Sequence, residues 1–148
     1  MKKSESFQML KDLASEQEQK ALQAVADANS RLDHAVRQLK MLEQYRHEYL
    51  QKLQNSMVVG TRSSMAANTQ RFIDNIDVAI AKQKNQVRTC EQQVMQQKEI
   101  WLEQRKKTRS MSTLLEREHM RELKKVVRNE QKRNDEFALQ AYRRAKTL

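Results

Sequence analysis

The chain has 148 residues, of which one is glycine, none is proline and 32% are charged. So few turn formers exclude a fold with many corners, and the apolar content is too low to fill one compact domain of this length. Abundant Ala, Leu, Gln, Glu, Lys, Arg and Met predict long helices rather than disorder. The formal net charge of +10 leaves nucleic acid, anionic lipid and acidic protein surfaces open as partners.

Residues 3 to 57 carry a heptad pattern. Apolar residues recur at alternating steps of three and four, with Arg46 as the break. They are Ala21, Val25, Ala28, Leu32, Ala35, Leu39, Leu42, Tyr49 and Leu53. The pattern predicts one helix over about 3–57. The opening "MKKSESFQMLKDL" has no apolar core of a secretion signal, so we expect a cytoplasmic protein.

A corner is predicted next, at about 58–67, because "MVVGTRSSMAAN" holds β-branched residues, the sole glycine and a serine pair. A second helix follows over about 68–145. Its apolar positions are Ile73, Ile76, Ile80, Val87, Cys90, Val94, Trp101, Met111 and Leu115. Because Gln83, Gln97, Gln104 and Thr108 interrupt this seam, we expect it to be the weaker of the two.

Two consecutive helices joined by a short turn run antiparallel. The sequence therefore predicts an all-α fold, an antiparallel two-helix coiled coil with a longer second helix, as a single rod over 1–148. With the corner centred near residue 62, the numbers of two residues that face each other across the helices add to about 124. This places Tyr45 level with Ala79, and Phe72 level with about Lys52. The chain start then faces about residue 120. The last 28 residues (148 minus 120) are left without a partner, and their apolar stripe continues, slipped by one residue, as Leu123, Val127 and Phe137.

Aromatic residues gather on one side of the predicted pair. The heptad phase places the following residues in one strip: Gln38, Leu42, Tyr45, Tyr49, Phe72, Ile76, Ala79 and, at its edge, Gln83. The rings could simply widen the seam. They could also form an exposed surface for a partner, since tyrosine is enriched at binding hot spots and a two-helix protein cannot bury its flanks.

Residues that carry catalysis or bind metal are not arranged for it. One glycine excludes a glycine-rich phosphate loop, and the three histidines form no one-turn pair. Glu116 and Glu118 are expected on an open helix with no cavity to shift their pKa. Cys90 is expected to be a structural thiol on the seam. We expect no cofactor, no metal and no enzymatic activity.

Basic residues concentrate toward the C-terminus. From Arg105 to Leu148 there are 14 Lys or Arg and 6 Asp or Glu, a net charge of +8. A basic-region DNA reader needs its zipper downstream of the basic segment, whereas here the heptads precede it. A solvated charged face, an acidic protein groove and nucleic acid all remain open as interpretations.

Several short motifs resemble those of one family. They are "LKDLA" at 10–14, "QLKMLEQYRHEY" at 38–49, "FI" at 72–73, Trp101 followed by "QRKK", and "DEFA" at 135–138. Together with the chain length and their spacing, these motifs resemble the bacterial flagellar export protein family FliJ, over nearly the whole chain.

The resemblance implies a two-helix coiled coil similar to the stalk of rotary ATP synthases. It implies binding to the hexameric flagellar export ATPase, to the cytoplasmic domain of the export gate and to export chaperones, in a non-enzymatic role. It also implies a location at the cytoplasmic face of the inner membrane, with membrane association through partners only. It also implies that the strip Gln38, Leu42, Tyr45, Tyr49, Phe72, Ile76 and Ala79 contacts the gate, although Gln83 replaces a family histidine. By likeness to the rotary stalk, ATPase contacts are expected at Leu123, Val127, Arg128 and Phe137. No nucleic acid is expected as a partner. The alternatives are a structural coiled-coil adaptor unrelated to secretion and a basic nucleic-acid-binding rod.

Overall fold

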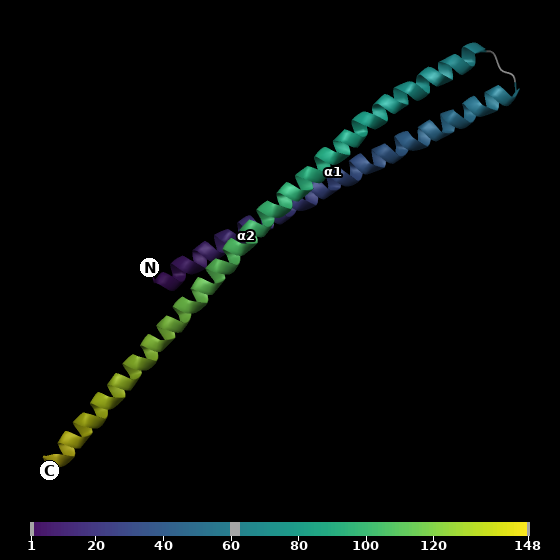
Figure 1. Ribbon diagram of the computed structural model, residues 1–148. Coiled ribbons are helices and arrows are strands. Elements are labelled where there is room, and N and C mark those ends of the chain that lie inside the picture. The colour runs from purple at the N-terminus through teal and green to yellow at the C-terminus, as the bar shows by residue number, and fades with distance from the viewer. Residues whose placement is uncertain (1, 60–62, 148) are drawn as a thin grey trace. The chain divides into compact units, whose positions relative to one another are not determined.

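The computed structural model describes residues 2–59 and 63–147. They form two helices, α1 (Lys3–Val59) and α2 (Ser63–Lys146), of 57 and 84 residues. Figure 1 shows α1 running back along α2, and no strand occurs in the two described ranges. The predicted fold class is confirmed, an all-α antiparallel two-helix coiled coil with a longer second helix.

The chain divides into two compact units. One comprises Lys20–Leu102, and the other comprises Met1–Gln19 together with Glu103–Leu148. Each unit contains part of α1 and part of α2. The boundary in α2, between Leu102 and Glu103, falls where polar residues interrupt the seam at Gln97, Gln104 and Thr108.

Both predicted seams are covered. Every residue placed on them by the heptad pattern is buried or half-buried, and the most enclosed are Ala28 and Ile73, with 1% and 2% of their surface exposed. Removing such apolar side chains from water contributes about 25 cal/mol per Å² buried. The seams are therefore the source of the pairing, since isolated helices in water are only marginally stable.

The polar interruptions of the second seam follow a regular arrangement. The Gln83 Nε2 donates a hydrogen bond to the Ala35 carbonyl oxygen at 2.9 Å, and the Gln104 Nε2 donates to that of Ala14 at 3.4 Å. We give the name alanine–glutamine series to two sets of seam residues. On α1 it comprises the alanines at 14, 21, 28 and 35, and on α2 it comprises the residues at 83, 90, 97 and 104, which are three glutamines and Cys90. Alanine is small enough for the amide to reach the backbone. Gln83 and Gln104 are thus paired rather than buried without a partner, which would be costly.

The corner is shorter than the predicted 58–67. α1 continues to Val59 and α2 already begins at Ser63, while Gly60, Thr61 and Arg62 lie outside the described residues. Valine and serine reduce helix stability by only about 0.7 kcal/mol or less per residue, so they do not end a helix that has a packed face. The numbers of the two residues that flank the turn, Val59 and Ser63, therefore add to 122 rather than to the predicted 124.

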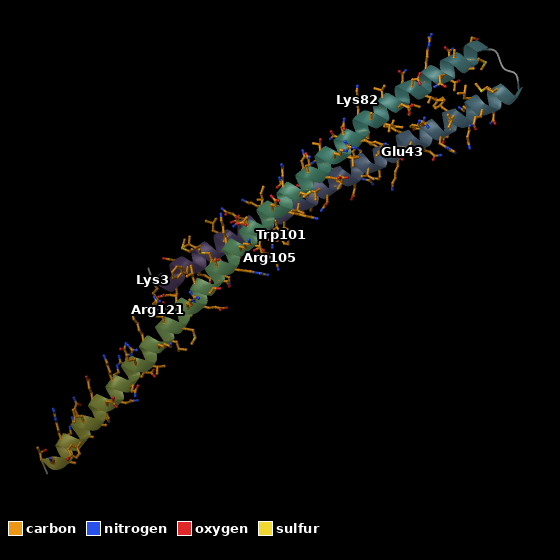
Figure 2. All side chains as sticks on the ribbon, viewed as in Figure 1. Lys3, Glu43, Lys82, Trp101, Arg105 and Arg121 are labelled. Carbon is orange, nitrogen blue, oxygen red and sulfur yellow. The ribbon has the colours of Figure 1, made fainter. Side chains whose placement is uncertain are left out.

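The unpaired end begins where α1 begins. Figure 1 shows α2 continuing alone past the start of α1, and Figure 2 labels Lys3 and Arg121 near this level. Ser4 and Glu118 are buried here, each 8% exposed, whereas every described residue from 123 to 147 is exposed. We name residues 123–147 the C-terminal extension. It begins within two residues of the predicted position.

Candidate functional site

The first candidate site lies in the unit Lys20–Leu102 and is built from both helices. We name it the aromatic strip, defined as Gln38, Leu42, Tyr45, Tyr49, Phe72, Ile76 and Ala79. Its residues occupy seam positions and the positions beside them on one side, which a helix presents together at spacings of three and four.

One end of the aromatic strip is an aromatic pair. The rings of Tyr49 and Phe72 stack with centroids 4.8 Å apart and an interplanar angle of 28°, and the Lys52 Nζ lies 5.1 Å from the centre of the Tyr49 ring. Phe72 was predicted to lie level with about Lys52, and its ring stacks on Tyr49, three residues before Lys52 on α1.

The other end of the aromatic strip is hollowed. Gln38, Met41, Leu42, Tyr45 and Gln83 line a depression of about 310 Å³. Tyr45 keeps 46% of its surface exposed, and the Gln83 Nε2 also donates to the Gln38 Oε1 at 3.3 Å. Met41, 55% exposed, was missed by the sequence analysis. Its position four residues before Tyr45 puts both side chains on one face of the helix, and this spacing could have identified it.

The members of the aromatic strip differ in what they offer to a partner. Ile76 is buried and Ala79 is half-buried, so they form its floor. Tyr45 and Phe72 are exposed, while Tyr49 and Leu42 are half-buried. An apolar surface is therefore present on this side, although part of each predicted residue already packs within the chain.

The opposite flank of the same stretch is charged. The Arg46 Nε donates to the Asp77 Oδ1 in an ion pair whose side chains are 41% and 46% exposed. Arg46, the break in the first seam, is thus half-buried and paired across the helices instead of being left unpaired.

The second candidate site is the C-terminal extension. Its predicted residues Leu123, Val127, Arg128 and Phe137 are all exposed, the three apolar ones by 56%, 55% and 76%. Val126, Leu139 and Tyr142 are further exposed apolar residues that the sequence analysis missed. The extension contains 8 Lys or Arg and 3 Asp or Glu, a net charge of +5. Such a helix presents an apolar stripe and a basic face to solvent.

One carboxylate departs from expectation. Glu118 was predicted on an open helix, but the start of α1 covers it, and its Oε2 accepts a hydrogen bond from Arg121 Nη1 at 3.4 Å. Glu116 is exposed as expected. A depression of about 460 Å³ beside Glu118 is lined by Lys2, Lys3, Glu122, Lys125 and Val126. The surrounding cations compensate the half-enclosed negative charges.

Other chemistry is sparse over the described residues. Within the ranges 2–59 and 63–147, no three His, Cys, Asp or Glu side chains gather as metal ligands. Cys90 is buried on the seam, where the Gln86 Nε2 lies 3.7 Å from its sulfur. Neither described helix contains an apolar stretch long enough to cross a membrane.

Comparisons with known proteins agree on one family. The family model described as "Flagellar FliJ protein" matches residues 2–147. The Flagellar FliJ protein of Escherichia coli (strain K12) is 33% identical over 132 residues, covering 89% of this chain and 90% of that protein. The Flagellar FliJ protein of Salmonella typhi is 31% identical over 136 residues, covering 92% of each. No solved structure matches the chain. The chain therefore belongs to the flagellar FliJ protein family.

Proposed function

We propose that the chain is a non-enzymatic component of the bacterial flagellar type III export apparatus. It binds the export ATPase ring as a stalk, promotes assembly of that ring, and links it to the export gate and to export chaperones. The observation that carries the proposal is family membership over residues 2–147 in a chain with two separate surfaces that its own helices leave uncovered.

The aromatic strip is the surface we assign to the cytoplasmic domain of the export gate. Support comes from the exposed rings of Tyr45 and Phe72 and from the depression beside Leu42. Tyrosine side chains bring a large rigid apolar area with a polar end, which is why they dominate many binding hot spots.

The C-terminal extension is the surface we assign to the export ATPase ring. An apolar stripe containing Leu123, Val127 and Phe137 has no cover within the described residues of the chain. Arg128 and the other cations suit an acidic lining, since complementary charge favours both encounter and orientation. Through these partners the protein works at the cytoplasmic face of the inner membrane.

Deleting residues 123–148 tests the assignment. We expect the truncated chain to lose stimulation of ATPase ring assembly, measured by sedimentation of the purified ATPase, while retaining full affinity for the gate domain by calorimetry. Its thermal melt should match that of the full chain, because the extension does not contribute to the seams. Ring assembly at wild-type concentrations of the truncated chain would refute the stalk assignment, and a parallel loss of gate binding would refute the separation of the two surfaces.

A further inference from the structure

The two flanks of the α2 seam differ in charge within the unit Lys20–Leu102. The residues directly after the seam positions 76, 83, 90 and 97 are Asp77, Lys84, Glu91 and Lys98. The residues directly before the seam positions 73, 80, 87, 94 and 101 are Phe72, Ala79, Gln86, Gln93 and Ile100. One flank is thus fully charged and the other carries no charge. Coiled-coil flanks in water commonly hold Glu and Lys, so an uncharged flank indicates a face that another chain covers.

Grooves lie along the uncharged flank beyond the aromatic strip. The depression at Tyr45 shares Gln38 with a second depression of about 560 Å³, whose lining on α1 includes Arg31 and His34 and on α2 includes Gln86, Cys90 and Gln93. No carboxylate lines either depression. The aromatic strip therefore continues into a longer groove that changes from apolar to polar and basic.

Resting on the proposed function, we propose that the gate domain engages this whole uncharged flank, from Phe72 to Gln93, and not the aromatic strip alone. The occupant is one amphipathic helix of the gate laid between α1 and α2 as a third strand of the coiled coil. Its apolar end covers Tyr45 and Phe72, and its acidic end lies over Arg31 and Gln93.

The length and charge of the flank define this occupant. The flank from Phe72 to Gln93 is about 30 Å long, which is the length of a helix of about 20 residues. An extended peptide would use backbone hydrogen bonds at a sheet edge, which the two helices do not offer, whereas an amphipathic helix in a groove uses side chains at helical spacing. Arg31 and His34 make no hydrogen bond or ion pair with other described residues, so both remain available to a carboxylate.

Matched substitutions on the full chain test the proposal. Gln93→Glu places a negative charge in the groove, and its neighbour Gln92→Glu places the same charge on the exposed outer face of α2. We expect gate affinity, measured by calorimetry with the purified gate domain, to fall at least about fivefold for Gln93→Glu and to stay within about twofold for Gln92→Glu. Arg31→Glu and its outer-face control Arg37→Glu should differ in the same way. Gln86→Glu replaces Gln93→Glu if the latter melts earlier than the wild-type chain.

The outcomes separate this inference from the proposed function. If the wild-type chain does not bind the gate domain at all, the proposed function fails. If Tyr45→Ala weakens gate binding while Arg31→Glu and Gln93→Glu do not, the gate uses only the aromatic strip and the longer face is wrong. If sedimentation shows that the chain self-associates and Gln93→Glu abolishes this, the occupant is a second copy, which also overturns the proposal.

Discussion

The paired part of α2 and the C-terminal extension belong to one helix but have opposite surroundings. Ile73 in the paired part is 2% exposed, whereas Leu123 in the extension is 56% exposed, although both occupy apolar positions at helical spacing. The difference arises from α1, which begins at Lys3 and covers α2 only as far as residue 122. An apolar stripe thus indicates which face of a helix can pack, and the length of the neighbouring helix decides whether that face is buried.

The largest contrast is expected from removing apolar side chains. Ile73→Ala should lower the free energy of unfolding by about 3 kcal/mol, because it removes buried methylenes and leaves a cavity between the helices. Leu123→Ala should change it by less than about 0.5 kcal/mol, because that side chain is exposed. Urea unfolding followed by circular dichroism measures both. Equal losses at the two sites would mean that the extension packs in solution.

Replacing the tyrosines of the aromatic strip should affect gate binding more than it affects stability. Tyr45→Ala with Tyr49→Ala is expected to weaken gate binding by at least about 2 kcal/mol, the size of a hot spot. Stability should fall less, because Tyr45 is exposed and the stack of Tyr49 on Phe72 contributes about 0.5–1.5 kcal/mol beyond its burial. Calorimetric titration and a thermal melt separate the two effects. A large loss of melting temperature with unchanged gate affinity would show that the rings serve the seam.

Replacing a polar residue of the second seam should raise the stability of the fold. Gln83→Leu should raise the free energy of unfolding by about 1 kcal/mol, because a buried leucine contributes more than a hydrogen bond to a carbonyl already bonded within its helix. Gln92→Leu on the exposed face is the matched control and should leave it unchanged. Destabilisation by Gln83→Leu would mean that the glutamine fixes the packing in a way that leucine cannot.

The smallest effect is expected at the charged flank. Arg46 and Asp77 form an ion pair with both side chains partly exposed, so their coupling should be below about 1 kcal/mol and should shrink in 1 M salt. A double-mutant cycle with Arg46→Ala and Asp77→Ala at two salt concentrations measures it. A coupling that does not respond to salt would indicate a less exposed pair.

The sequence predicted the faces of the helices better than their register. The heptad repeat placed every seam residue correctly, because the phase is counted within one helix and does not depend on the turn. Which residues of α1 and α2 face each other is harder to predict, because it depends on where the turn is centred, and an error of one residue there changes the sum of two facing residue numbers by two. Val59 and Ser63 misled this estimate, since weak helix formers still join a helix that packs.

Some parts of the sites depend on contacts between the helices, and the sequence alone does not show these. The burial of Glu118 follows from the start of α1 lying beside it, and the hollow at Tyr45 needs Gln83 from the other helix. The exposure of the C-terminal extension was predictable, because it requires only the difference between the two helix lengths. The roles of the two surfaces stay predictions until partners are tested.

The alanine–glutamine series has a mechanical consequence. Its alanines and its glutamines or cysteine both repeat every seven residues, so sliding α1 along α2 by seven residues returns most alanines to a position opposite an equivalent side chain. One such slide is about 10 Å long. The series alone therefore does not distinguish positions of α1 that differ by seven residues, and the covalent connection from Val59 to Ser63 fixes which of them forms.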